Sequence, residues 1–135
     1  MSIPRQALTA ALCLLVLAGC GGDGRLKPRG RIVKGGAAFT VPEDDYLRVT
    51  FFPVTSDGRP PKNTYAATSN GSDGTFQAVG PDGKGIPPGK YRIALEYEGK
   101  KKKDIFKGAY DGDRSRFVFD IDSSTKELVL DLDKP

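Results

Sequence analysis

The sequence predicts an all-β protein built as a single antiparallel β-sandwich of about seven strands. The first observation is composition, because 17 Gly and 10 Pro among 135 residues are typical of a chain with many turns and few long helices. The second is that apolar residues recur with a period of two from residue 30 onward, as they do on half-buried strands. The third is that Asp-Gly, Gly-Gly and Pro-Gly turn signals separate these runs.

The N-terminal segment has the pattern of an export signal. Arg5 is the only charged residue before Asp23, and positions 7–17 are apolar apart from Thr9. An apolar core of this length is typical of a signal peptide and is shorter than the roughly 20 residues that a membrane-spanning helix needs. Residues 1–19 are therefore predicted to form a signal peptide that is cleaved from the mature protein.

Small residues and a cysteine end this segment, in the order Leu17, Ala18, Gly19, Cys20. The run resembles the lipobox of bacterial lipoproteins. That resemblance implies that signal peptidase II recognises Leu17, Ala18 and Gly19, and that the Cys20 thiol carries a diacylglyceryl group. The protein would then be exported and held by membrane lipid on the extracytoplasmic side, in the periplasmic leaflet or at the cell surface. The alternative is an ordinary secretory peptide in which Cys20 is incidental.

Residues 20–29 are predicted to be the acylated cysteine and a flexible tether, followed by one domain at residues 30–135. The tether is rich in Gly and charged residues and has no periodic apolar positions. A flexible coil of this length spans roughly 15 to 18 Å, which keeps the domain close to the lipid surface. Because Cys13 lies in the signal peptide, the mature chain has no disulfide, and its apolar core alone must hold the domain.

Four runs show the strand period most clearly. The clearest lies at residues 91–98, where Tyr91, Ile93 and Leu95 alternate with Arg92, Ala94 and Glu96. The other three runs are residues 47–52, 117–121 and 128–132. Each predicts a strand that packs one face and leaves the other in water.

Weaker strand candidates complete the expected domain. They lie at residues 31–34, 63–68, 75–79 and 104–106. The segment Ile86-Pro87-Pro88-Gly89 is not expected inside a ladder, because its prolines lack N–H donors, and Gly89 permits a turn into the strand that follows. No register is predicted near Ala37 and Ala38.

One stretch of sequence carries a family resemblance. It consists of Asp73-Gly74-Thr75-Phe76, a Gly- and Pro-rich loop at residues 80–89, and Lys90-Tyr91-Arg92-Ile93-Ala94-Leu95. This order resembles the carboxypeptidase regulatory-like (transthyretin-like) domains of small exported bacterial lipoproteins. The likeness extends from residues 30–33 to residues 128–132 and so covers the predicted domain. The family implies an immunoglobulin-like sandwich that serves as an accessory or binding module, without catalysis.

Composition excludes several kinds of chemistry. The chain has no His, so imidazole catalysis and His-ligated metals are excluded. The protein is not expected to be an enzyme, and no catalytic residue, metal or cofactor is predicted. The acidic groups at Asp111, Asp113 and Asp122 and at residues 43–45 are interpreted as solvated carboxylates, with calcium binding at either loop left open. Because the charge is mixed, with a formal net charge of +4, nucleic acid is not an expected partner.

A run of lysines, Lys100, Lys101, Lys102 and Lys103, separates two strand candidates. The first interpretation is a solvated hairpin tip that discourages edge-to-edge pairing. The second is a membrane-surface contact, because each lysine near an anionic leaflet contributes on the order of 1 kcal/mol.

Aromatic residues that break the core alternation or end a strand are candidates for ligand stacking. They are Tyr46, Phe52, Tyr65 and Tyr110. Exposed aromatic rings of this kind suit sugar rings, although the chain has no Trp to form a wide platform.

Three classes of function follow from these observations. The first is a non-enzymatic, lipid-anchored module of the cell envelope that contacts an envelope protein or polysaccharide. The second is a carbohydrate-binding lipoprotein that uses exposed Tyr and Phe rings. The third is a transport or chaperone accessory, which would need an internal cavity for apolar cargo.

Overall fold

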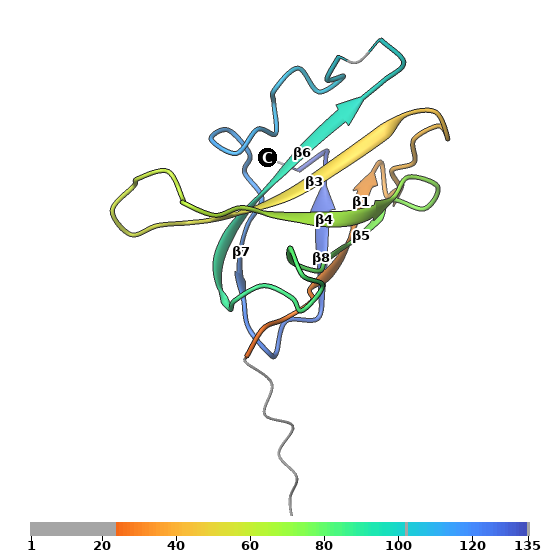
Figure 1. Cartoon of the computed structure of the whole chain (residues 1–135). Coiled ribbons are helices and arrows are strands. Elements are labelled where there is room, and N and C mark those ends of the chain that lie inside the picture. Colours follow the sequence, from red (N-terminus) through yellow and green to blue (C-terminus); the bar gives the residue numbers. More distant parts are fainter. Residues whose placement is uncertain (1–23, 102, 135) are drawn as a thin grey trace, which may run out of the picture.

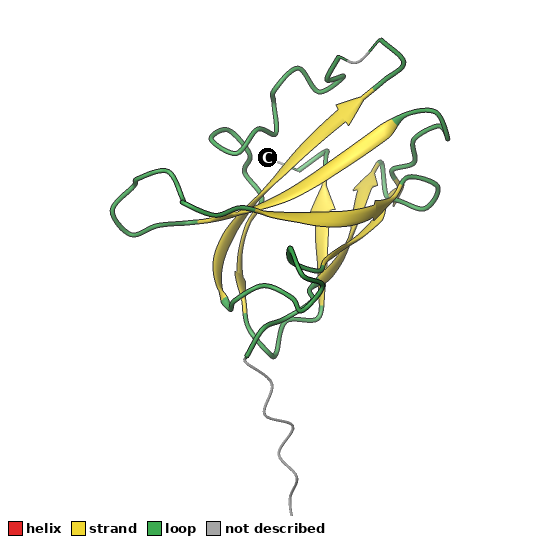
Figure 2. Cartoon of the chain, viewed as in Figure 1, coloured by secondary structure: helices red, strands yellow, loops and turns green. Residues whose placement is uncertain are grey.

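The computed structural model describes residues 24–101 and 103–134, and this part of the chain is all-β (Figure 1). Figure 2 shows strands joined by loops and turns, with no helix in the described residues. A helix with the length and apolarity needed to cross a membrane is accordingly not found among them. The strands are β1 (Arg29–Lys34), β2 (Ala37–Ala38), β3 (Tyr46–Pro53), β4 (Tyr65–Asn70), β5 (Thr75–Ala78), β6 (Gly89–Glu98), β7 (Val118–Ile121) and β8 (Glu127–Asp131).

All the strands belong to one hydrogen-bonded sheet. The strand order is β2-β1-β5-β4-β3-β6-β7, and β8 pairs with β1. The pairs are antiparallel except for β1 and β8, which run parallel from Arg29 beside Glu127 to Val33 beside Asp131. At the centre, β6 pairs with the whole length of β3. The structure therefore confirms an all-β, mainly antiparallel fold.

The sheet curls on itself and does not divide into two separate layers, so it forms an open half-barrel where the sequence predicts a sandwich (Figure 1). The reason lies in the hairpin of β4 and β5, which stays paired from Ala67 beside Ala78 to Asn70 beside Thr75. One continuous hydrogen-bonded sheet consequently extends from β8 round to β7. Within the described residues no ladder joins β7 to β8, so the curl stays open along that side.

A single cluster of fifteen buried apolar residues fills the concave side of the sheet. In the central strands the buried positions alternate, as at Val49 and Phe51 of β3 and at Ile93 and Leu95 of β6. The Phe51 ring lies 6.1 Å, centroid to centroid, from the ring of Phe76 on β5. The core therefore joins strands from both halves of the curl, which is where most of the stabilising apolar burial of the domain lies.

The strands agree with most of the sequence prediction. All four clear runs are strands, and three of the four weaker candidates are found as β1, β4 and β5. A strand at residues 104–106 is wrong, because turns follow directly after Asp104. The Asp104 carboxylate accepts hydrogen bonds from the backbone N–H groups of Tyr97 (2.9 Å), Phe106 (3.0 Å) and Gly108 (2.8 Å). The chain therefore wraps around this side chain and does not extend.

The short strand β2 settles the register near Ala37 and Ala38, which the sequence left undetermined. Ala38 pairs with Val33, and Ala37 pairs with Lys34. The turn between β1 and β2 has positive φ at both central residues, 61° at Gly35 and 77° at Gly36. Two consecutive positive φ angles are the signature of a type I′ hairpin turn, which explains the two glycines.

Irregular backbone covers the edge of β6 beyond β7. The strand β7 pairs only with the first residues of β6, from Gly89 to Arg92. Farther along, the N–H of Ile93 donates to the Phe117 carbonyl (2.8 Å), and the N–H of Leu95 donates to the Tyr110 carbonyl (3.0 Å). The edge donors are thus satisfied without a regular strand, and the loop around residue 112 is brought onto the outer face of the sheet.

Candidate functional site

The lipobox residues Leu17, Ala18, Gly19 and Cys20 lie outside the described residues. The described chain begins at Gly24 and joins the fold at once, because Leu26 and Ile86 exchange two backbone hydrogen bonds (2.8 and 2.7 Å). Ile86 lies just before β6 in the sequence. The chain therefore enters the domain at the end of the sheet where β6 begins (Figure 1).

The lysine run lies at the opposite end of β6. Lys100, Lys101 and Lys103 are exposed in the turn region that follows this strand, and Lys102 lies outside the described residues. Because β6 has ten residues, its two ends are roughly 30 Å apart. The lysines and the start of the described chain therefore lie at opposite ends of this strand, and Lys100 Nζ lies 3.7 Å from Asp44 Oδ2.

The four aromatic residues considered for ligand stacking are not brought together. Tyr46 is 54% exposed at the start of β3, whereas Phe52 is half-buried near the end of the same strand. Tyr65 packs edge-on against a buried tyrosine of β6, with ring centroids 6.2 Å apart. Tyr110 stacks on a buried phenylalanine at 5.5 Å. Tyr65 and Tyr110 thus pack against the core, whereas Tyr46 and Phe52 do not belong to it, and the four rings do not form one flat platform.

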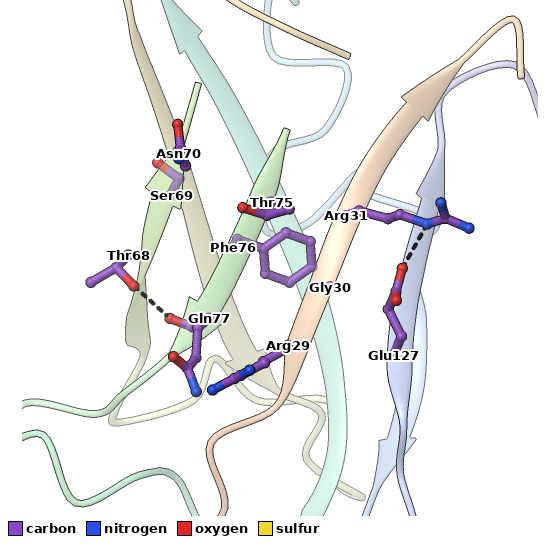
Figure 3. A pocket seen from close by; sticks show the side chains of 10 residues that line it. All are labelled: Arg29, Gly30, Arg31, Thr68, Ser69, Asn70, Thr75, Phe76, Gln77 and Glu127. Carbon is purple, nitrogen blue, oxygen red and sulfur yellow. Dashed lines mark hydrogen bonds and ion pairs between the residues drawn. The ribbon is translucent and has the colours of Figure 1, made fainter. Parts of the chain in front are cut away.

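A polar groove of about 540 Å³ lies on the outer face of β4, β5 and β1 (Figure 3). Most of its lining side chains come from alternate positions of each strand, because every second residue points to the same face. We call this feature the polar groove. It is lined by Arg29, Gly30, Arg31, Thr68, Ser69, Asn70, Thr75, Phe76, Gln77 and Glu127.

The strand register arranges the polar side chains of the groove in two rows. In the first row Arg29 of β1 stands beside Gln77 of β5, which stands beside Thr68 of β4. The second row consists of Arg31, Thr75 and Asn70. Each row crosses three strands and therefore extends for roughly 10 Å. The groove thus presents guanidinium, amide and hydroxyl groups at regular spacing.

Some of these groups are engaged by neighbours and others are not. Arg31 Nε lies 2.6 Å from Glu127 Oε1, between two exposed side chains (Figure 3). The Thr75 hydroxyl and the Thr75 N–H both donate to the Asp73 carboxylate, and these hydrogen bonds lower the pKa of Asp73. The Arg29 side chain makes no hydrogen bond or ion pair with any other described residue. The polar groove therefore keeps one uncompensated positive charge.

A second hollow, of about 520 Å³, lies on the outer face of β3 and β6. Phe52 and Arg92 stand side by side in it, because they are direct partners in the ladder of these two strands. The loop between β3 and β4 provides one wall, and the loop around residue 112 provides the other. We call this hollow the arginine cleft. Its further lining residues include Val54, Pro60, Pro61, Gly112 and Asp113.

The acidic residues considered for calcium are not gathered around a common point. No group of three or more His, Cys, Asp or Glu residues among those described is placed to hold a metal ion. The Asp122 carboxylate accepts from the N–H (2.8 Å) and the hydroxyl of Ser124, which lowers the pKa of Asp122. Asp45 accepts from the hydroxyl of Tyr97 (2.7 Å). Both carboxylates therefore serve turns and packing within the fold.

The sequence reasoning missed both hollows. The outward-facing polar positions of the strands were visible in the sequence, at Arg29, Gln77 and Asn70 among others. The alternation of residues predicts that such side chains share a face, but only the pairing of β1, β5 and β4 sets them beside one another. Phe52 was singled out, whereas its ladder partner Arg92 was not.

Comparisons of the chain with protein-family models, with curated proteins and with solved structures found no match in any of the three. The features that bear on function are consequently the sequence motifs and the geometry of the two hollows.

Proposed function

We propose that this protein is a non-enzymatic module of the cell envelope that is anchored by lipid at Cys20 and binds a polymer through the outer face of its curled sheet. The anchor is supported by the run Leu17-Ala18-Gly19-Cys20 after an apolar segment. Binding is supported by one observation above all, the two aligned rows of hydrogen-bonding side chains in the polar groove.

The distance between anchor and domain suits this role. Cys20 precedes Leu26 by about six residues, which an extended chain spans in ~20 Å. Because Leu26 joins the sheet at the end where β6 begins, the domain is held near the lipid by that end. The outer face of β1, β4 and β5 then stays accessible to a partner in the same envelope. On this proposal the protein is exported and lies on the extracytoplasmic side of its membrane.

The chemistry of the polar groove suits a chain rich in hydroxyl, carbonyl or carboxylate oxygens. The Thr68 hydroxyl donates to the Gln77 carbonyl (3.3 Å) and the Gln77 amide donates to the Lys27 carbonyl (3.4 Å), so the oxygen atoms of both side chains remain as acceptors for hydroxyl groups of such a chain. The Arg29 guanidinium offers a planar fork of donors that matches a carboxylate on the same chain. A polysaccharide of the envelope is therefore the preferred partner, and a protein partner is the alternative within the same proposal.

The hypothesis of a carbohydrate-binding lipoprotein is thus retained, but with a different binding site. We expect sugar recognition in the polar groove and not at the dispersed rings of Tyr46, Phe52, Tyr65 and Tyr110. A transport or chaperone role has no comparable support, because the concave side of the sheet is filled by the core cluster of the protein itself.

We also propose that the curled sheet is a variant of the immunoglobulin-like or transthyretin-like sandwich of the carboxypeptidase regulatory-like family. In this interpretation β8, β1 and β5 form one half and β4, β3, β6 and β7 form the other. The contact of Phe51 with Phe76 between the two halves supports it. Hydrogen exchange of the backbone amides tests this interpretation: rapid exchange along the paired residues of β4 and β5 would favour two separate sheets, whereas protection equal to that of β3 and β6 would favour the half-barrel.

The anchor is tested by producing the whole chain in a bacterium and measuring the mass of the product. We expect a mature protein that begins at Cys20, carries the diacylglyceryl group and fractionates with membranes. Cys20→Ser should abolish the lipid, whereas the matched control Cys13→Ser should behave as the wild type, because Cys13 is removed with the signal peptide. A wild-type product with a free Cys20 thiol would contradict the anchor.

The groove is tested by affinity electrophoresis of the whole chain in gels that contain dextran, xylan or polygalacturonate. We expect retardation by at least one of these polymers. The double variant Arg29→Ala/Gln77→Ala should weaken it by about tenfold or more, because each lost hydrogen bond contributes roughly 1 kcal/mol. Arg48→Ala/Thr50→Ala is the matched control on the outer face of β3 and should not change the retardation. Migration unaffected by every polymer would contradict polymer binding.

A further inference from the structure

We propose that the arginine cleft binds a small monocarboxylate whose body is apolar or ring-shaped. This site is separate from the polar groove and does not depend on the function proposed above. The central residue of the cleft is Arg92, whose side chain is half-buried on the outer face of β6. Its Nε atom is shielded from solvent and has no hydrogen-bond partner. No other described residue forms an ion pair or hydrogen bond with its guanidinium.

This arrangement is energetically unfavourable in the absence of a partner. A shielded N–H donor without an acceptor loses the hydrogen bond that it makes to water in the unfolded chain. Arg48, on the same outer face, instead lies 3.4 Å from the Glu96 carboxylate through its Nη1 atom. The register sets Phe52 on one side of Arg92 and Val118 on the other, so that its immediate neighbours in the ladder offer no acceptor side chain.

The cleft around Arg92 is largely apolar. The Phe52 ring and the prolines Pro60 and Pro61 line it, together with Val54. Gly112 closes it on the other side, where the space for a side chain is taken by the Phe52 ring. An apolar surface around one cation suits a ligand that carries a single anionic group on an apolar or ring-shaped body, whereas a fully hydrated inorganic anion would leave the walls unused.

The charges at the rim favour a carboxylate over a doubly charged anion. Arg59 lies 3.6 Å from Asp57 in an exposed pair, so it adds little to the potential in the cleft. Asp113 lines the cleft and is exposed. Its negative charge repels a dianion such as phosphate more strongly than a singly charged carboxylate. Because Arg92 Nε is shielded, a carboxylate would pair with the outer end of the guanidinium, where Nη1 and Nη2 donate two parallel hydrogen bonds.

The site is tested by titrating the isotope-labelled whole chain in detergent micelles with benzoate and following the Arg92 Nε–H signal by NMR. We expect saturable shifts of this signal and of the backbone amides of Phe52 and Gly112. Benzamide, the neutral analogue of the same shape, should bind at least tenfold more weakly, because it cannot accept two charge-assisted hydrogen bonds. Inorganic phosphate should also bind more weakly than benzoate.

Three variants separate the proposed contacts. Arg92→Gln should weaken benzoate binding at least tenfold, and Arg48→Gln on the same face is the matched control that should leave binding unchanged. Asp113→Asn should tighten binding severalfold by removing the repulsion at the rim. Should Arg92→Gln fail to fold, Phe52→Leu provides the second variant, which keeps an apolar side chain and is expected to weaken benzoate binding by removing the ring.

Several results would overturn this proposal. Equal affinities for benzoate and benzamide would show that the charge of Arg92 plays no part. Unchanged binding by folded Arg92→Gln would place the benzoate elsewhere. Contacts between Arg92 and Asp113 in the free protein, together with no gain in affinity for Asp113→Asn, would mean that the chain satisfies this arginine by itself.

Discussion

The ring of Phe76 on β5 lies directly over Gly30 on β1, its partner in the ladder of these strands. A Cβ atom added to Gly30 would overlap the Phe76 ring and would lie only 2.5 Å from the Leu128 carbonyl oxygen. Gly30 is held between β5 on one side and β8 on the other. The glycine is therefore needed for the space that it leaves to an aromatic ring, and not for a positive φ angle.

Gly30→Ala is expected to lower the free energy of unfolding by about 3 kcal/mol, because the methyl group displaces both the Phe76 ring and the β8 backbone. Urea unfolding followed by circular dichroism measures this change. The matched control is Gly99→Ala, where the added atom meets only the end of the exposed Ile105 side chain. The control should change the free energy by less than about 1 kcal/mol. Equal effects of the two variants would contradict the role of the Phe76 ring.

Asp104→Ala should destabilise the segment that covers the edge of β6, because three backbone N–H groups lose their acceptor. We expect a loss of roughly 2 to 3 kcal/mol in the free energy of unfolding. Hydrogen exchange of the amides of Tyr97, Phe106 and Gly108 should quicken more than that of the core amides. Asp44→Ala, which removes only an exposed pair with Lys100, is the control and should have an effect below about 1 kcal/mol.

Tyr91 should be the last tyrosine to ionise. Burial, with a smaller contribution from Tyr65, raises the pKa of Tyr91 from 10.0 to about 12. The buried hydroxyl also donates to the Pro87 carbonyl (2.6 Å), a bond that ionisation removes. Since the folded-state pKa is the higher one, this stabilisation is complete below pH 10.0 and is lost as the pH rises towards about 12.

Ultraviolet titration of tyrosinate tests this order of ionisation. The difference between the wild type and Tyr91→Phe should appear near pH 12. A difference centred near pH 10.0 would show that Tyr91 is accessible to water in the folded protein.

Acid should weaken the turns that Asp73 and Asp122 organise. Hydrogen bonds from the hydroxyl and N–H of Thr75 lower the pKa of Asp73 below 3.8, and those from Ser124 do the same for Asp122. Because the folded-state pKa is the lower one, these carboxylates stabilise the fold above pH 3.8, and the stabilisation is lost as the pH falls further.

The double variant Asp73→Asn/Asp122→Asn tests this dependence. Asparagine keeps an acceptor oxygen for each turn but has no charge to lose. The urea midpoint of the double variant should therefore fall less than that of the wild type between pH 4 and pH 2. The urea midpoints of both proteins are also measured at neutral pH, and their difference there serves as the reference. Parallel curves for the two proteins across this range would rule out a contribution from these carboxylates.

Much of the local structure of this domain could be predicted from the amino-acid pattern alone. Alternation at residues such as Ile93, Leu95, Val49 and Phe51 predicted both the strands and their buried faces, because the side-chain period of a strand is two. The glycine pair just before β2 marked a tight turn, because glycine adopts two consecutive positive φ angles without strain. The strand predicted at residues 104–106 is wrong for a local reason, because the Asp104 carboxylate accepts hydrogen bonds from three backbone N–H groups.

The neighbours of each strand, and therefore the two hollows, depend on tertiary packing and could not be predicted from local patterns. A period of two is the same in a sandwich and in a half-barrel, so it could not predict that β4 and β5 would stay paired and close one continuous sheet. It also could not predict that Gln77 stands beside Arg29, or Arg92 beside Phe52. These pairs join residues far apart in the chain, and their alignment depends on the register of whole ladders, which is set by the burial of the common core.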